Sequence, residues 1–511
     1  MRRHAATGHQ AGMHRLVLRS GRIVSMHHAL PARRSPALGP EPADQPARAP
    51  CGIAFRGRFR SLLREPAAAA VPGASAVDHR VDVDVLVIGA GIAGLLVAAY
   101  ARRSGMRTHV VERRRIPGGR FSGELLNGAQ ISTGALHLIP HGRRGPLARA
   151  LRELGIRQSI IQSDVLFSVW SPHRHVTCTR HHHLFTRVLA PREFPTATRM
   201  LFLLKRDRAF PGTVDEWLRV HRIHGLMVDL VRAGVDFALS VRLDQLPYRD
   251  FRAVVVSFYK LGGPGLPRGG SRALADQLLD HVEQAGATVR MHTEVTAVER
   301  HPDGQAWLVH CRDRDSGQLL EIRARDVVGT AGDDAPGPYA PARDARPLGD
   351  GPACGFKIQL LLPFSIVPHN GVMLCIGTRR LSGLAQVTNA DRSLAPPGQH
   401  LVNTFHTCRA DADPAVERRE ALRDVAAIAG RDIDDSWILS SAIYRGVWPV
   451  NRRTQGHEMS QQIAPGFLLA GDACKPTGAI MVEAAAQSAV EAARRLNDGR
   501  RAAPRGREPG P

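Results

Sequence analysis

The stretch Val85-Leu86-Val87-Ile88-Gly89-Ala90-Gly91-Ile92-Ala93-Gly94 decides the fold of this chain. A β-branched apolar run enters a turn of the form Gly-x-Gly-x-x-Gly, and a helix is expected over residues 95–103. Gly89 permits the tight turn, Gly91 lets the backbone approach phosphates, and Gly94 lets the helix pack closely on the strand. The helix N-terminus adds amide donors and a partial positive charge. Residues 89–94 are therefore predicted to hold the pyrophosphate of a dinucleotide.

An acidic residue stands at the distance from this turn that a dinucleotide site requires. A second predicted strand, Thr108-His109-Val110-Val111, ends on Glu112. A carboxylate about 20 residues beyond the glycine turn reaches the hydroxyls of the adenosine ribose. Strand, turn, helix and acid in this order indicate a Rossmann-like α/β fold rather than a chance run of glycines.

A second glycine-rich segment lies near the end of the chain. The apolar run 466–470 leads into Gly471-Asp472, and an alanine-rich helix is predicted over residues 482–496. This is again a buried strand, a turn and a helix. We interpret the two distant segments as halves of one dinucleotide site.

The segment Glu112-Arg113-Arg114-Arg115-Ile116-Pro117-Gly118-Gly119-Arg120 resembles one in the amine oxidase and phytoene desaturase superfamily. The resemblance extends over residues 82–496 and implies a flavoprotein whose cofactor is FAD. It implies that Arg114, and Arg120 after the Gly118-Gly119 turn, lie against the FAD, because guanidinium donors match phosphate oxygens. Arg113 and Arg115 are expected to face solvent, since only some positions of such a run can face one ligand.

The same resemblance assigns roles to residues farther along the chain. It implies that Asp472, after Gly471, holds the ribityl chain. It also implies that the helix beginning at Met481 and Val482 points its N-terminus at the flavin, where negative charge gathers on reduction. The residue matching Val295 contacts the adenine through its backbone in this superfamily.

Two departures from the superfamily pattern alter the expected flavin environment. The segment 481–489 lacks three glycines that the superfamily carries there, at Met481, Ala484 and Ala489. Ser132 replaces an acid that often precedes the Thr133-Gly134 pair. Elsewhere, four segments look most like the phytoene desaturase and carotenoid isomerase branch, namely 118–121, 133–137, 394–398 and 448–452.

The predicted architecture is α/β, with a Rossmann-like FAD-binding domain that is discontinuous in sequence and a second α+β substrate domain. A chain of 511 residues exceeds the roughly 250–300 residues at which single cores stop growing. The predicted FAD-binding parts are 81–150, 266–338 and 456–497, and the substrate parts are 151–265 and 339–455. The substrate domain is expected to hold a helix capped by Thr213 and Glu216 and strands over 356–362, 371–376 and 401–406.

The two ends of the chain are predicted to be disordered. Residues 1–80 form an extension rich in Arg, Ala and Pro, and residues 498–511 form a loose tail. Three explanations of the extension remain open: a misassigned start codon, a tail that touches acidic surfaces, and an organelle transit peptide. No run of about 18 apolar residues predicts a transmembrane helix.

The net charge of +22 does not by itself indicate nucleic-acid binding. Only four of the 69 basic residues are lysines, and no recognition motif or aromatic-interleaved basic stripe accompanies them. The excess of arginine over lysine is typical of a GC-rich genome, and a basic face in peripheral contact with an anionic membrane is favoured over nucleic-acid binding. The seven cysteines form no Cys-x-x-Cys pair, which suits a reducing compartment and a cytoplasmic location.

The histidine clusters 173–175 and 181–183 are expected to lie on a solvated strand or hairpin rather than to bind a metal. Consecutive residues of a strand alternate between its faces, so three adjacent histidines cannot converge on one ion.

The favoured function is an FAD-dependent oxidoreductase of a long apolar polyene or isoprenoid substrate, such as a carotenoid, acting by hydride transfer at flavin N5 as a desaturase, saturase or isomerase. Such an enzyme needs little acid–base apparatus, and no side chain can be assigned as catalytic. One alternative is a flavin amine oxidase, in which Tyr444 and Trp448 would form an aromatic cage. Another is a flavin-binding protein without catalysis.

Overall fold

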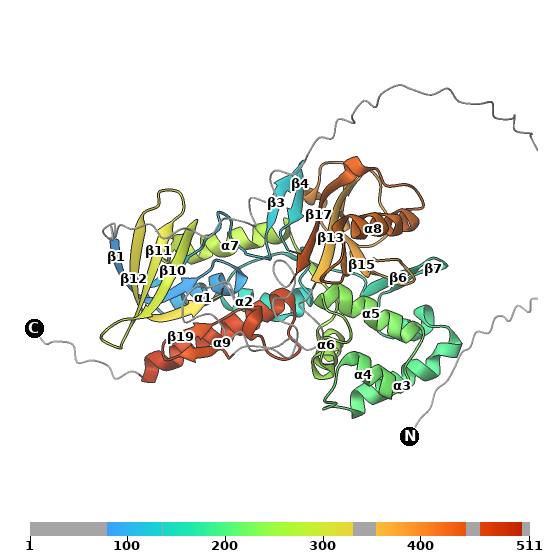
Figure 1. Cartoon of the computed structure of the whole chain (residues 1–511), viewed down its shortest axis with the longest axis horizontal. Helices are drawn as coiled ribbons and strands as arrows, with labels where there is room; N and C mark the ends of the chain where they lie inside the picture. The colour runs from blue at the N-terminus through green and yellow to red at the C-terminus, as the bar shows by residue number, and fades with distance from the viewer. Residues whose placement is uncertain (1–78, 135, 331–353, 446–459, 503–511) are drawn as a thin grey trace, which may run out of the picture. The chain divides into compact units, whose positions relative to one another are not determined.

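The computed structural model describes residues 79–134, 136–330, 354–445 and 460–502. They all belong to one compact unit, Ala74–Pro511. Most of the extension predicted over 1–80 lies outside the described residues, as does the 448–452 segment with Trp448. Within the described part, two sheets carry separate sets of helices (Figure 1).

The first sheet is mixed and surrounds the glycine-rich turn. Its described strands are β1 (His79–Ile88), β2 (Thr108–Val111), β9 (Thr288–Arg290), β10 (Thr293–Arg300), β11 (Trp307–Asp313), β12 (Leu319–Gly329), β18 (Gln462–Ala464) and β19 (Phe467–Leu469). β1 runs parallel to β2 and β12, β9 runs parallel to β2, and β19 runs parallel to the end of β12. β10 and β11 continue from β12 as antiparallel strands.

Side chains alternate along β1 between two hydrophobic clusters. Val85 and Val87 pack against a cluster formed mainly with helices, whereas Leu86 and Ile88 pack with Trp307 and other side chains of the sheet. The helices of the first cluster are α1 (Ile92–Arg103), α2 (Pro146–Glu153), α7 (Gly270–Gln284) and α9 (Met481–Ala502). α9, from the end of the chain, packs against α1 and α2 from its beginning (Figure 1).

The second sheet is almost entirely antiparallel. Its described strands are β6 (Phe167–Ser171), β7 (Arg174–Cys178), β13 (Cys354–Leu362), β14 (Val372–Cys375), β15 (Gly383–Gln386), β16 (His400–Thr407) and β17 (Ile438–Arg445). β6 and β14 are parallel, and the other neighbouring pairs are antiparallel. Two smaller ladders join β3 (Gly123–Leu126) to β4 (Ala129–Ser132) and β5 (Ile160–Gln162) to β8 (Gly265–Pro267).

Helices pack on both faces of the second sheet. Phe356 and Ile358 of β13 pack with Val425 of α8 (Pro414–Ala429). Phe405 of β16 belongs instead to the cluster of Phe237, in α5 (Leu226–Leu239). The remaining helices of this part are α3 (Phe194–Arg206), α4 (Val214–Val220) and α6 (Tyr248–Leu261). None of the described helices is long and apolar enough to cross a membrane.

Several predicted elements are confirmed. Thr213 caps α4, its Oγ1 accepting from the Glu216 amide at 3.3 Å, while Glu216 accepts from the Thr213 amide at 2.8 Å. The three strands predicted in the second half are β13, β14 and β16. His173 and His175 lie in the exposed β6–β7 hairpin, as predicted. Residues 181–183 differ from the prediction, because they lie in a turn that leads into the π-helix Leu184–Val188 rather than on a strand or hairpin.

Three predicted boundaries differ from the structure. α1 begins at Ile92 rather than Leu95, because Gly91 already serves as its N-cap. β1 begins at His79, inside the predicted extension, because its first residues pair with β12. α9 continues to Ala502, beyond the predicted start of the tail at residue 498, and Arg500 Nη1 donates to Ser104 O at 2.5 Å. The sequence pattern near residue 500 could not predict this contact, because its partner Ser104 lies 396 residues away in the sequence.

Candidate functional site

The turn between β1 and α1 leaves room for an anion. Gly91 is the N-cap of α1, no side chain caps the helix, and its first turn holds no acidic residue. A side chain at Gly91 would meet nothing within 4 Å, so the space on that side is open. At Gly94, by contrast, a Cβ would lie 1.9 Å from Gly89 O. Helix amides facing open space form a site for phosphate.

Glu112 binds this turn from the end of β2. Its Oε2 accepts from the Ala90 amide at 2.7 Å, and its Oε1 accepts from the Arg114 amide at 2.8 Å. The side chain is buried, which raises the pKa of Glu112, while the two amide hydrogen bonds act in the opposite direction. The predicted ribose acceptor therefore also holds the backbone of the phosphate turn. Each carboxylate oxygen keeps a further acceptor site for a ribose hydroxyl.

The Gly118-Gly119 turn lies directly on the first glycine turn. The Gly118 amide donates to Ala90 O at 2.8 Å. A Cβ added at Gly119 would lie 3.3 Å from the Gly91 Cα. Gly118 has φ +91°, and a Cβ there would lie 2.6 Å from that of Ala275. A side chain at Gly94 or at Gly118 would therefore collide with neighbouring atoms.

Arg120 joins the two distant halves of the site. Its guanidinium forms an ion pair with the carboxylate of Asp472, which follows Gly471 after β19. Asp472 is buried, and the Gly471 amide donates to Ser488 Oγ of α9 at 2.8 Å. The structure thus brings together two residues that the resemblance assigned to one cofactor.

Arg114 and Val295 belong to segments whose backbone amides donate to Glu112. Arg114 Nη2 lies 3.6 Å from Glu124 Oε1, and its side chain is partly buried. Val295 is buried in β10, just after Thr293, whose amide donates to Glu112 O at 2.8 Å. Arg113 and Arg115 are exposed, as expected, and Arg115 pairs with Asp315.

The start of α9 is held in an unusual conformation. Met481 has φ +50°, a left-handed conformation that favours glycine, and it occupies the place of a superfamily glycine. Val482 is buried among the helices of the first cluster. Glu483 is also buried and accepts from the Leu147 amide at 2.7 Å and the His141 amide at 3.3 Å. Burial raises the pKa of Glu483 to about 7. This carboxyl ties the start of α9 to the start of α2.

Sequence reasoning missed two buried basic side chains that hold the Thr133–His137 loop. Lys357 Nζ of β13 donates to Ser132 O at 2.7 Å and to Gly134 O at 2.5 Å. Burial lowers the pKa of Lys357 to about 7. A Cβ on Gly134 would lie 2.1 Å from Arg120 O, so this loop contacts the turn that carries Arg120. Lys357 is one of only four lysines in a chain with 69 basic residues, and this rarity could have marked it for attention in the sequence.

His137 supports the same loop from the other end. Its Nε2 donates to Gln130 O at 2.8 Å, and its Nδ1 lies 2.7 Å from Ser271 Oγ at the start of α7. Burial lowers the pKa of His137 to about 4, so the ring is neutral near pH 7. A neutral, fully hydrogen-bonded histidine indicates a positioning role.

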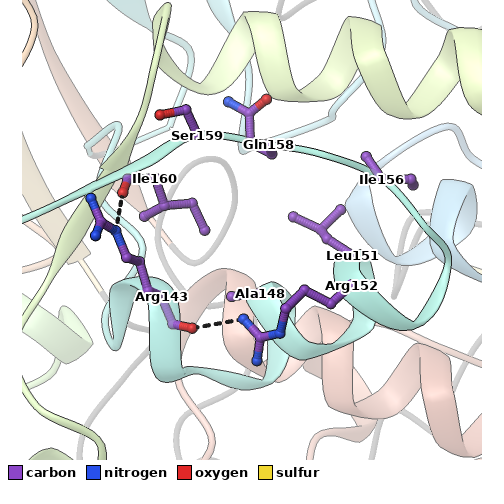
Figure 2. A pocket seen from close by; sticks show the side chains of 8 residues that line it. All are labelled: Arg143, Ala148, Leu151, Arg152, Ile156, Gln158, Ser159 and Ile160. Atoms are coloured by element: carbon purple, nitrogen blue, oxygen red, sulfur yellow. Dashed lines mark hydrogen bonds between the residues drawn. The ribbon is translucent and has the colours of Figure 1, made fainter.

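A pocket of about 290 Å³ lies apart from these residues (Figure 2). It is formed by α2 and the segment 156–160, and Arg143 Nε donates to Ile160 O at 2.6 Å while Arg152 Nη1 donates to Arg143 O at 2.9 Å. None of the predicted cofactor residues lines it. We therefore place the candidate site at the glycine turns and not at this pocket.

Comparison with known proteins decides which cofactor this geometry serves. The model of the family described as flavin containing amine oxidoreductase matches residues 92–497. The chain belongs to this family. Its cofactor is accordingly FAD, and the open space at Gly91, the Glu112 carboxylate and the Arg120–Asp472 pair are chemically suited to that dinucleotide.

Relatives of this flavin-dependent family member cover most of the chain. An uncharacterized protein of Methanocaldococcus jannaschii is 28% identical over 420 residues, which are 80% of this chain and 98% of that protein. The crystal structure of an oxidoreductase from Methanosarcina mazei is 26% identical, with a TM-score of 0.70 over 80% of this chain and all of that one. Putrescine oxidase with bound putrescine, 14% identical, has a TM-score of 0.61 over 82% of this chain and 100% of its own. That last likeness shows the fold alone.

Proposed function

We propose that this flavin oxidoreductase acts on a long apolar substrate of the polyene or isoprenoid class, as a desaturase, saturase or isomerase. One observation carries the proposal. The hydrophobic cluster that contains Phe237 and Phe405 extends as far as Ile480, which is 1% exposed, and Met481 packs against it. The apolar interior therefore reaches the start of α9, which the resemblance directs at the flavin.

A substrate lying against this cluster would meet hydrocarbon side chains rather than polar groups. Leu136, Leu361 and Phe405 are among its buried members. When bound, FAD supplies the exchange of hydride with the substrate. The protein's share is to align the substrate and exclude water, and apolar side chains perform both tasks.

We assign no proton-transfer role to the buried bases of the site. Lys357 and His137 have their polar atoms directed at backbone carbonyls and at Ser271, where they hold the loop against Arg120. Their roles in this proposal are to position that loop. In a desaturation the substrate would lose a hydride to FAD and a proton to solvent, and in a saturation it would gain both, so this proposal routes the proton through no side chain.

Amine oxidation is the second candidate, and the family description favours it. Tyr444 of β17 packs against the same hydrophobic cluster, and burial raises the pKa of its phenol to about 12. An aromatic face at this place would orient an amine. Trp448, the other predicted member of the cage, lies outside the described residues.

Anaerobic reduction of the holoprotein tests the proposal. Polyenes, isoprenoid lipids, porphyrinogens and amines are added separately to the oxidised protein, and the flavin absorbance band is followed. Because a saturase or isomerase starts from reduced flavin, the dithionite-reduced protein is mixed with the same panel, and reoxidation and product are followed. We expect turnover with polyenes or isoprenoids.

The variants Tyr444→Phe and Tyr444→Leu distinguish the two candidates. Loss of the ring should leave turnover of an apolar substrate within a few fold, whereas an amine oxidase should lose activity in Tyr444→Leu and keep it in Tyr444→Phe. Reduction by amines alone would overturn the proposal. No reaction with any compound in either flavin state would favour the flavin-binding protein without catalysis.

A further inference from the structure

Helix α3 exposes apolar side chains on the face that points away from the core. Its buried face is formed by Ala197, Met200, Leu203 and Leu204. On the outer side, Leu201 is 46% exposed, Phe202 is 60% exposed and Phe194 is 36% exposed. A helix at a water-facing surface normally carries polar residues there. Neighbouring exposed apolar side chains indicate an interaction surface.

The three side chains lie close together around the helix. Phe194 and Leu201 are seven residues apart, which is about two turns, so they project in nearly the same direction. Phe202 follows at the next position and widens the apolar strip. We call the outer side of α3, with Phe194, Leu201 and Phe202, the α3 face.

Cationic residues surround the α3 face. Arg199, Lys205 and Arg206 are exposed on the helix itself, and α3 contains no acidic residue from Phe194 to Arg206. Arg192 and Arg208 are exposed just beyond its two ends. Apolar side chains interspersed with basic ones are typical of helices that lie in the interface of a bilayer.

The two acids that flank α3 are engaged within the protein. Glu193 Oε2 accepts from the Ala190 amide at 2.8 Å. Asp207 Oδ2 lies 2.8 Å from His221 Nε2 and accepts from Trp217 Nε1 at 3.3 Å. Asp207 Oδ1 also pairs with Arg206 Nε at 3.3 Å, which offsets that one cation. Arg199 and Lys205 remain as exposed basic residues of an α3 sequence that contains no acid.

We propose that the α3 face docks on an anionic lipid bilayer. Phe194, Leu201 and Phe202 would enter the headgroup–acyl boundary, and Arg199 and Lys205 would bind lipid phosphates. The charge selects this occupant over a second copy of the chain, because two α3 faces in contact would place like charges against each other.

The proposed docking does not depend on the substrate class proposed above, but an apolar substrate is compatible with it. The buried side of α3 belongs to the same hydrophobic cluster that includes Ile480 and is packed against by Met481. Docking through the α3 face would therefore bring the bilayer, and any apolar molecule dissolved in it, next to the hydrophobic cluster that reaches the start of α9.

Vesicle co-sedimentation of the full-length holoprotein tests the docking. One set of vesicles contains phosphatidylcholine with phosphatidylglycerol, and the other contains phosphatidylcholine alone. We expect binding to the anionic vesicles that weakens with added salt. The double variant Leu201→Ser/Phe202→Ser should bind at least tenfold more weakly, because it removes two side chains that leave water on docking.

Two further variants make the test specific. Arg199→Gln/Lys205→Gln should lose most of the preference for anionic vesicles. Leu125→Ser alters a side chain that is 76% exposed on the β3–β4 hairpin, and it should bind as the unaltered protein does. FAD content and circular dichroism verify folding; should Leu201→Ser/Phe202→Ser misfold, the charge variant and the salt dependence decide the outcome.

Three results would overturn the proposal. The first is equal binding by Leu201→Ser/Phe202→Ser, which would assign the vesicle contact to another part, such as the arginine-rich residues 1–78. The second is equal binding to neutral and anionic vesicles, or to neither. The third is self-association of the protein that the same double variant abolishes, which would make the α3 face a contact between copies of the chain.

Discussion

The Arg120 guanidinium and the Asp472 carboxylate form an ion pair although they are 352 residues apart in the sequence. Arg120 follows the Gly118-Gly119 turn, and Asp472 follows β19. The pair therefore joins the first and the last segments of the candidate FAD site. Because the pair is partly buried, removal of either side chain would leave the other charge without its partner and shielded from water.

Arg120→Met and Asp472→Asn should each weaken FAD binding by about 1–3 kcal/mol, or roughly tenfold per 1.4 kcal/mol. The loss in the double variant should be smaller than the sum, because each single change removes the same ion pair. Titration of the apoprotein with FAD, followed by flavin fluorescence, measures all three affinities. Strictly additive losses would show that the two side chains act separately.

Glu112→Ala should destabilise the protein even without FAD. Two backbone amides, at Ala90 and Arg114, lose their acceptor, and unsatisfied buried donors cost about 1–3 kcal/mol. Urea unfolding of the apoprotein measures this loss, and FAD titration measures the additional loss of affinity. Arg113→Ala is the matched control, since Arg113 is exposed on the same segment. An apoprotein of unchanged stability would contradict the structural role of Glu112.

Gly94→Ala should abolish FAD binding or folding, because its Cβ would lie 1.9 Å from Gly89 O. Gly234→Ala is the opposite case. Gly234 lies within α5 with nothing within 4 Å of a Cβ, so alanine should stabilise the protein by about 0.5–1 kcal/mol. Thermal unfolding and flavin content of the two variants check both expectations. Equal stability and flavin content of the two variants would mean that Gly94 lies farther from Gly89 O than the structure shows.

Met481→Gly should be more stable than Met481→Ala by about 1 kcal/mol. Both changes delete the same side chain, but only glycine adopts φ +50° without steric cost. This order is the reverse of ordinary helix propensity, in which alanine is favoured over glycine. Urea unfolding of the two variants measures the difference. Greater stability of the alanine variant would show that the left-handed conformation is absent.

Lys357 should make stability increase with pH above neutrality. Its pKa is lowered from 10.5 to about 7 by burial, so between these values the unfolded chain binds more protons than the native one. The free energy of unfolding therefore rises with pH across this range, by at most about 1.4 kcal/mol per pH unit. The comparison of the unaltered protein with Lys357→Met, by denaturant unfolding from pH 6 to 9, isolates this contribution. Parallel pH profiles would contradict it.

The sequence by itself determined the parts of the site that depend on local backbone geometry. The strand, turn and helix from Val85 onwards, and the acid at Glu112, follow from glycine conformations and apolar patterns within a short segment. The Thr213 cap could be predicted for the same reason, since its hydrogen bonds reach only three residues. The family resemblance supplied FAD and the expected roles of Arg120 and Asp472 against it.

Tertiary structure alone decided how those parts are held. Whether Lys357 is buried depends on the packing of β13 against the Thr133–His137 loop, and no pattern near residue 357 encodes that contact. The contact of Glu483 with the start of α2 likewise joins segments that meet only in the folded chain. Local sterics act over a few residues and can be read in order along the sequence. Burial and long-range hydrogen bonds arise only when distant segments exclude water together.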